Sequence, residues 1–265
     1  MSDVVIPEGK PIEGREPLDL NFALTAILST ALASPSASPP AHREVTEHQV
    51  VSIPGNGSTG PFRVDATEVT IAQFEEFVAA GGYENDALWG SGGLEWLSSQ
   101  NHASNPDKRR SGRPPHHPVV AVSWYEADAY CRWRGGSLPS DEQWTAAVCG
   151  DNAPFPWGEG EPESQGRQAG RTGPTWFANG KYGRINRVAT NPATVQRSDL
   201  VGPHGLLHGA GNVWEWSSTP YSPNSSHMTL RGGSYMNLPS YCRCDHREPA
   251  RPSDQRLTAG FRCAY

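Results

Sequence analysis

The sequence predicts an α+β fold with short helices, short strands and long irregular loops. Three helix starts share one capping pattern, β-type residues come in short runs, and glycine and proline interrupt the chain throughout. Gly 28 and Pro 24 together make about a fifth of the 265 residues. They are interleaved with Trp, Tyr, Phe and Val, which need burial, so a folded, loop-rich domain is favoured over a low-complexity chain.

The helix caps predict three helices of roughly ten residues each. Each start places a hydroxyl residue three positions before a Glu or Gln, so that side chains and backbone amides can pair reciprocally. The pairs are Thr70 with Gln73, Ser123 with Glu126, and Ser140 with Gln143. Each end has a glycine suited to the left-handed conformation in which helices commonly stop. These glycines are Gly81-Gly82, Gly135-Gly136 and Gly150.

Short runs of β-type residues predict strands at 50–53, 119–122, 213–216, 229–234 and 260–263. Between Cys149 and Gly202 the chain is rich in Gly, Asn, Pro and Arg and has little periodicity. A loop of that length is rarely structureless in a compact domain. We therefore expect turns, a bound ion or its own aromatic residues to hold it. These aromatic residues are Phe155, Trp157, Trp176 and Phe177.

Residues 1–33 form a signal-like or disordered N-terminal segment. The apolar run 22–33 has the length of a secretory signal core and ends in Ala31-Leu32-Ala33, a small-x-small pattern typical of a cleavage site. The region before it is long and net acidic, which favours the alternative of a disordered tail. A Pro/Ser/Ala-rich linker, 34–47, precedes the domain at 48–265. We expect export to the periplasm or the exterior, with a cytoplasmic location as the alternative.

Charge and hydropathy exclude several classes of partner. The net charge of -6 and the pI of about 5.8 argue against nucleic-acid binding, which favours a basic face. No stretch approaches the ~18–20 continuous apolar residues of a membrane span. We expect the partner to be a protein or a small polar ligand.

Common catalytic and metal-binding motifs are absent from the sequence. It has no phosphate-binding glycine-rich loop after a strand, no Gly-x-Ser-x-Gly and no His-Glu-x-x-His. Cys242 and Cys244 form a Cys-x-Cys without zinc-finger spacing. His204 and His208 could share a helix face, but the Gly-Leu-Leu between them favours a turn.

A series of short motifs in order resembles the sulfatase-modifying-factor domain, the fold of the formylglycine-generating enzyme. The resemblance covers about residues 48–265. Its motifs lie at 64–70, 117–124, 129–133, 138–144, 155–158, 205–206, 211–216 (Gly-Asn-Val-Trp-Glu-Trp), 231–234 (Arg-Gly-Gly-Ser) and 260–263 (Gly-Phe-Arg-Cys). This resemblance implies a compact, irregular relative of the C-type lectin fold.

The family's enzymes oxidise a cysteine of a sulfatase to formylglycine, using oxygen and a copper(I) ion held by two thiolates. Two thiolates suit such a soft cation. In those enzymes the two cysteines follow the Gly-Gly-Ser as Cys-x4-Cys. Here Asn237 stands at the first thiolate position and Cys242 at the second. The resemblance therefore implies a copper site that lacks one of its two ligands.

The resemblance also assigns the other four cysteines. Cys131 and Cys263 match a structural disulfide pair of some family members, and Cys149 is the natural partner for Cys244. Two such bridges fit an oxidising compartment. Cys242 is then the odd thiol.

Calcium is a further cofactor that the resemblance implies, since one family site uses an Asn or Asp just before Gly-x-Gly-Asn. Calcium prefers hard oxygen ligands, and His208, a poor ligand, stands at that position. The carbonyls of Gly209, Gly211 and Val213 could still contribute. A second site is expected in the irregular segment, near Asn179 or Asn186.

Two functions follow as hypotheses. The first is a binding module that has lost redox chemistry and recognises its ligand through the C-terminal loop (residues 235–247), as lectin-like relatives do. Its candidate residues are Tyr235, Asn237, Leu238, Tyr241, Arg243, Asp245, His246 and Arg247. The alternative is an oxygen-dependent oxidase of the formylglycine-generating type, with Cys242, Ser234, Trp214 and Tyr241 as its candidate catalytic residues. Copper is expected only for the oxidase, where His246 or Cys244 would have to serve as the second ligand.

Overall fold

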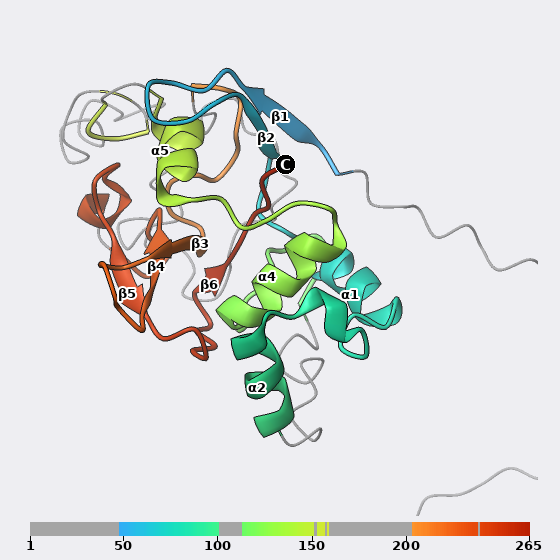
Figure 1. The fold of residues 1–265 in the computed structure, drawn as a ribbon. Helices are drawn as coiled ribbons and strands as arrows, with labels where there is room; N and C mark the ends of the chain where they lie inside the picture. Colours follow the sequence, from blue (N-terminus) through green and yellow to red (C-terminus); the bar gives the residue numbers. More distant parts are fainter. Residues whose placement is uncertain (1–47, 101–112, 151–152, 157, 159–202, 238) are drawn as a thin grey trace, which may run out of the picture. The chain divides into compact units, whose positions relative to one another are not determined.

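The computed structural model describes residues 48–100, 113–150, 153–156, 158, 203–237 and 239–265 (Figure 1). All of them belong to one unit, Val45–Tyr265. Several expectations lie outside the described residues. They concern the N-terminal segment 1–33 and the linker 34–47, the aromatic residues Trp157, Trp176 and Phe177, the calcium candidates Asn179 and Asn186, and Leu238.

The three predicted helices are confirmed as α1 (Ile71–Ala79), α4 (Trp124–Trp133) and α5 (Asp141–Cys149). Each begins with the reciprocal pairing that the sequence predicts. In α1, for example, the Gln73 amide donates to Thr70 Oγ1 at 3.3 Å, and the Thr70 amide donates to Gln73 Oε1 at 2.9 Å. The caps therefore fix where these three helices start.

The described residues also include a fourth α-helix, α2 (Ser91–Ser99), beyond the three that the caps predict. Its N-cap, Gly90, has no side chain to cap it. Packing holds the helix instead: Trp96 is buried and stacks on Trp89 with 6.0 Å between ring centroids. Two short 3₁₀ helices, η1 (Asp86–Leu88) and η4 (Pro239–Cys242), complete the helical elements of this part of the chain.

The strands form two small sheets. In the first, β1 (Val50–Ile53) pairs antiparallel with β2 (Phe62–Asp65). The second has the order β5-β4-β3-β6 and consists of β3 (Trp214–Pro220), β4 (Met228–Arg231), β5 (Glu248–Ala250) and β6 (Ala259–Gly260). Its neighbours are antiparallel except β3 and β6, which run parallel. The predicted α+β class is confirmed.

The predicted strand at 119–122 is wrong. Val119 donates its amide to the Val69 carbonyl at 2.9 Å, and Ala121 donates to Arg256 at 3.0 Å. Ala121 has a φ of 58°, a left-handed conformation that breaks any extended strand. The apolar residues 119–122 are buried in the core. Their backbone amides bond to two separate segments, at Val69 and at Arg256, and not to one neighbouring strand. Strands β2 and β5 were not expected from the sequence, and the expected strand 260–263 is limited to β6.

Two apolar clusters form the core. The larger one joins α1, α4 and the chain end around Phe74, Phe77, Tyr130 and Phe261, with Phe74 stacked on Tyr130 at 5.6 Å between centroids. The smaller one packs α5 against the β1–β2 pair (Figure 1). Its largest side chain is Trp144 of α5. In the described part of the chain, no helix has the length and apolarity to cross a membrane.

A buried ion pair connects the parts of the fold. The Arg262 guanidinium donates to both carboxylate oxygens of Glu215, each at 2.7 Å. It also donates to the backbone carbonyls of Asp65 and Leu207, at 3.1 and 2.9 Å. The Arg262 and Glu215 side chains are 0% and 1% exposed, so neither charge reaches water. Strands β2 and β3, the segment before β3 and the chain end thus meet at one guanidinium.

Replacing Arg262 with methionine should lower the free energy of unfolding by about 3–5 kcal/mol, because Glu215 would keep a buried charge without its partner. Urea unfolding followed by tryptophan fluorescence measures the loss. The matched control is Arg132→Met, which removes an ion pair with Asp128 whose arginine side chain is 49% exposed and should cost about 1 kcal/mol or less. Equal losses in the two variants would contradict a central role for Arg262.

Candidate functional site

Two left-handed glycines lead from β4 into the C-terminal loop. Gly232 and Gly233 have φ values of 87° and 74°, which disfavour any other residue. Space is also short, since a Cβ atom on Gly233 would lie 3.1 Å from Cys242 Sγ. The glycine pair therefore allows the start of the loop to pack directly on the cysteine.

Asn237, at the position of the first expected thiolate, closes a turn. Its Oδ1 accepts hydrogen bonds from the Ser234 amide at 3.0 Å and from the Ser234 hydroxyl at 2.6 Å. The backbone amide of Asn237 donates to the Ser234 carbonyl at 2.9 Å. An Asn side chain that bonds back to nearby backbone is a common turn device. Both Asn237 and the candidate catalytic Ser234 are thereby used in holding the loop.

Cys242 is the free cysteine of the chain, and it is buried. Burial raises the pKa of its thiol to about 12, although a hydrogen bond from the Gly211 backbone opposes the shift. The thiolate is the form that attacks electrophiles and binds metals. At neutral pH this cysteine is therefore a protonated, poorly reactive thiol.

Trp214, Tyr241 and His246 form an aromatic cluster beside Cys242. The ring centroids of Tyr241 and His246 are 4.8 Å apart, and Trp214 lies 5.8 Å from His246 and 6.2 Å from Tyr241. Burial lowers the pKa of His246, so its ring is neutral at pH 7. Two of the four candidate catalytic residues, Trp214 and Tyr241, are thus in contact. No hydrogen bond among the described residues joins Cys242 Sγ to Ser234 or His246.

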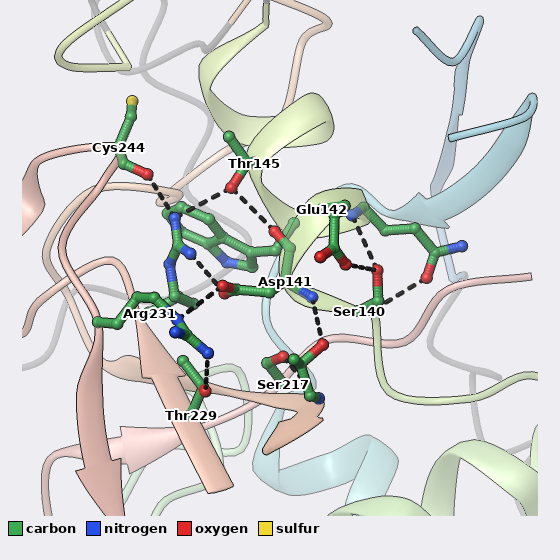
Figure 2. Close-up of polar contacts among 12 residues, drawn as sticks. Ser140, Asp141, Glu142, Thr145, Ser217, Thr229, Arg231 and Cys244 are labelled. Atoms are coloured by element: carbon green, nitrogen blue, oxygen red, sulfur yellow. Dashed lines mark hydrogen bonds and ion pairs between the residues drawn. The ribbon is translucent and has the colours of Figure 1, made fainter. Parts of the chain in front are cut away.

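Arg231, the last residue of β4, ties the C-terminal loop to α5 (Figure 2). Its guanidinium pairs with Asp141 in the first turn of α5 and donates to Thr145 Oγ1 at 3.0 Å and to the Cys244 carbonyl at 2.5 Å. It also lies over the Trp144 ring, 4.6 Å from the centroid. This network holds one side of the loop in place.

Two further ion pairs order the charged residues of the loop. Arg247 lies with its Nε 2.7 Å from Asp141 Oδ2, which joins the loop end to the same carboxylate that binds Arg231. Arg243 donates to both oxygens of Asp245, at 2.9 and 3.1 Å. The sequence did not single out Asp141, although an acidic residue at the first position of a capped helix is a signal for a stabilising charge.

Both disulfides that the resemblance implies are present. Cys131–Cys263 joins α4 to the chain end, and Cys149–Cys244 joins the end of α5 to the C-terminal loop. Their Cα atoms are 5.5 and 6.0 Å apart. The loop is therefore fixed to α5 by a covalent bond as well as by Arg231.

A buried polar pair includes Asn212, which belongs to the segment 208–213 where the resemblance implies a calcium site. Asn212 donates from Nδ2 to Glu68 Oε1 at 2.7 Å, and both side chains are fully buried. Their other oxygens, Glu68 Oε2 and Asn212 Oδ1, have no hydrogen-bond partner among the described residues. Burial raises the pKa of the Glu68 carboxyl to about 8, against the opposing effect of Arg262. Sequence reasoning missed Glu68, because it is far from Asn212 along the chain.

Two of the residues expected to offer carbonyls, Gly211 and Val213, are the chain neighbours of Asn212. The Gly209 carbonyl oxygen faces Gly232 instead, 3.0 Å from where a Cβ atom on Gly232 would lie. His208 is buried and has a left-handed φ of 59°. His204 and His208 are joined by a turn, as the sequence predicts. The described residues contain no cluster of three His, Cys, Asp or Glu side chains suited to a metal ion.

Comparisons with known proteins agree with the motif resemblance. The model of the "Sulfatase-modifying factor enzyme 1-like domain" family matches residues 42–265. The formylglycine-generating enzyme of Streptomyces coelicolor is 33% identical over 257 residues, which cover 77% of this chain and 78% of that enzyme. The enzyme of Bos taurus is 30% identical over 250 residues, and the match covers 77% of this chain and 65% of the enzyme.

A relative with a different name also matches. The hercynine oxygenase of Mycolicibacterium smegmatis is 28% identical over 254 residues, and this chain spans only 54% of its length. Among solved structures, PvdO from Pseudomonas aeruginosa aligns with a TM-score of 0.55 at 17% identity, covering 82% of this chain and 91% of that one. Treponema denticola variable protein 1 aligns with a TM-score of 0.53, also at 17% identity, over 82% and 92% of the two chains. These two structures show the shared fold.

Proposed function

Because this chain belongs to the sulfatase-modifying factor enzyme 1-like domain family, we propose that it uses the family scaffold as a binding module and not as a copper-dependent thiol oxidase. The observation that carries this proposal is the role of Asn237. Its side chain closes the Ser234 turn where a copper-binding thiolate would be required. Fold and function separate readily when the residues of a site change.

The donor set does not fit a copper(I) ion held by two thiolates. Cys242 is one thiol, and burial raises its pKa to about 12. Cys244 is bound to Cys149, so its sulfur is not available as a thiolate. The His246 ring packs against the rings of Trp214 and Tyr241. Cys242 is therefore without a second free thiol, because the other four cysteines are in disulfides.

The C-terminal loop offers a surface suited to polar recognition. The Met236 residue is 58% exposed, and the side chains of Asp245 and Arg243 are 70% and 37% exposed. Tyr235, Tyr241 and His246 are half-buried beside them. An aromatic, basic and acidic mixture on a fixed loop matches the make-up of many protein-binding sites. The ligand class we propose is a protein or a small polar molecule.

The two disulfides are compatible with export, because such bonds persist in oxidising compartments. We propose a periplasmic or extracellular location on this basis. There the binding surface would be open to extracellular partners.

An oxidase remains the second candidate, and a specific observation favours it. The Streptomyces coelicolor relative that is named a formylglycine-generating enzyme is 33% identical to this chain. The rings of Trp214 and Tyr241 are also in contact, and Cys242, the residue after Tyr241, is a free cysteine. This candidate would require Cys242 to react without a second thiolate.

Copper(I) binding separates the two candidates. The natural protein should not take copper(I) from a tight chelator. Asn237→Cys should bind copper(I) at least about tenfold more tightly than the natural protein, since it supplies the missing thiolate. The measurement is a chelator-competition titration under nitrogen. The matched control is Ser240→Cys, which adds a thiol at an exposed position of the same loop.

Tight copper(I) binding by the natural protein would contradict the proposal, and so would copper-dependent oxidation of a cysteine peptide. Equal gains in Asn237→Cys and Ser240→Cys would show that position 237 is not special.

Calcium is the cofactor that we propose for the buried oxygen cluster. Glu68 Oε2 and Asn212 Oδ1 would supply two hard oxygens, and the carbonyls of Gly211 and Val213 would add backbone ligands. His208 would not take part, because an imidazole is a poor calcium ligand. Without a cation the raised pKa keeps the Glu68 carboxyl mostly protonated at neutral pH, so calcium binding would release its proton.

Calcium should raise the thermal unfolding midpoint of the natural protein. At a calcium concentration one hundred times the Kd, the gain in stability should be about 2.7 kcal/mol. Glu68→Gln should remove the calcium effect, because it deletes the charged ligand while it keeps the hydrogen bond to Asn212. Differential scanning calorimetry of both proteins with calcium, with magnesium or with a chelator measures the unfolding midpoints. Identical midpoints of the natural protein with calcium and with chelator would rule the site out.

A further inference from the structure

We propose that small thiols reach the Cys149–Cys244 disulfide through a cleft and reduce it, and that this reduction releases the C-terminal loop from α5. The cleft lies between the end of α5 and the C-terminal loop, and both cysteines line it together with Gly150, Ala153 and Pro154. Its volume is about 680 Å³, which is ample for a thiol of a few heavy atoms. This inference rests on the proposed binding function, because it regulates the loop that carries that function.

The two disulfides of the chain have different surroundings. Cys131 and Cys263 are both 0% exposed and lie in the larger apolar cluster. Cys149 and Cys244 belong to the smaller apolar cluster, are 3% and 7% exposed, and also line the cleft. Thiol–disulfide exchange requires a thiolate to attack a sulfur directly, so the access of the thiol limits its rate. The Cys149–Cys244 disulfide is therefore the one that a small thiol reduces first.

The place of Cys149 in the fold sets the order of the exchange. Cys149 is the last residue of α5, where the partial negative charge of the helix end disfavours a thiolate. Cys244 is therefore the better leaving group, and the small thiolate attacks Cys149 Sγ. A bond forms between these two sulfurs, the bond to Cys244 Sγ breaks, and its electron pair leaves with Cys244 as a thiolate.

A second small thiol completes the reduction. Its thiolate attacks the small-thiol sulfur of the mixed disulfide, and Cys149 leaves with the electron pair. Two small thiols are thereby oxidised to one small disulfide, and their two protons end on Cys149 and Cys244. This second step is slowed because it forms a thiolate at the end of α5, so the mixed disulfide on Cys149 accumulates.

The charges around the cleft are balanced, which favours an uncharged thiol. The charged residues are Arg231, Arg243 and Arg247 against Asp141, Glu142 and Asp245. An acidic or a basic thiol would find no net charge of the opposite sign there. An uncharged thiol enters without that requirement and without the cost of moving a charge out of water.

Reduction removes the covalent link between the loop and α5 but leaves the polar contacts. Arg231 still donates to Thr145 Oγ1 of α5 and to the Cys244 carbonyl of the loop, at 3.0 and 2.5 Å (Figure 2). Such hydrogen bonds open and close while the rest of the domain stays folded. A loop that opens locally must be ordered again when a ligand binds, which weakens binding. The disulfide thus controls how well the loop is preorganised.

The first test uses the full chain with both disulfides formed and 2-mercaptoethanol as the probe. Without denaturant, Cys149–Cys244 should be reduced at least about tenfold faster than Cys131–Cys263, because only the former lines the cleft. The first adduct should be a mixed disulfide on Cys149. Acid quenching at timed intervals, alkylation of free thiols and mass spectrometry of the peptides measure the rates and the adduct.

The cleft itself is tested by narrowing it. Ala153→Trp should slow the reduction of Cys149–Cys244 at least about fivefold, because the indole ring takes up space beside the disulfide. The matched control is Ala87→Trp, the same change at an exposed position of η1, which should leave the rate unchanged. Hydrogen exchange of the reduced natural protein measures the release, and the amides of residues 241–246 should exchange at least about tenfold faster than before reduction.

Four results would overturn the inference. They are equal reduction rates of the two disulfides, equal effects of the two tryptophan variants, a first adduct on Cys244, and unchanged hydrogen exchange of the loop after reduction. None of these bears on the loss of copper chemistry, because the copper titration of Asn237→Cys uses protein with both disulfides intact and decides that separately.

Discussion

The fully buried ion pair between Arg262 and Glu215 is the constraint on which the rest of the structure depends. Glu215 also accepts a hydrogen bond from Trp144 Nε1 at 2.8 Å, so the same carboxylate positions α5. The first turn of α5 then holds Arg231, which binds the Cys244 carbonyl and fixes the C-terminal loop. A continuous set of polar contacts thus runs from the centre of the core to the candidate functional surface.

Asn237 is the residue on which the proposed loss of copper chemistry rests. At this position a thiolate would complete a copper site, whereas an amide oxygen closes a turn against Ser234. The neighbouring Cys242 is buried beneath the turn, and its raised pKa keeps it protonated. Under the proposed function, the side chain at position 237 decides between a copper site and a structural turn. The order of the C-terminal loop comes from Arg231 and from the Cys149–Cys244 disulfide.

Local sequence patterns predicted the features that depend on neighbouring residues. The starts of α1, α4 and α5 follow from hydroxyl caps that act over three positions. Helix α2 was missed because its N-cap residue, Gly90, has no side chain that could cap the helix. The helix depends on tertiary packing, which no local pattern shows. The strand at 119–122 failed because the left-handed Ala121 leaves no mark in the apolar pattern. The contacts of Arg231 with Asp141 and of Glu68 with Asn212 join residues 90 and 144 positions apart, and no local pattern shows them. The disulfides could be anticipated only through the family resemblance.

The central claim is that Cys242 is an inert, buried thiol in a loop that has lost its redox partner. Mass spectrometry of the folded protein tests this most directly, with alkylation before digestion, without reductant, and after incubation with copper and oxygen. The account predicts the bridges Cys131–Cys263 and Cys149–Cys244, together with a Cys242 that is reduced and is alkylated only after unfolding. A bridge from Cys242 to another cysteine, or its copper-dependent oxidation, would contradict the account.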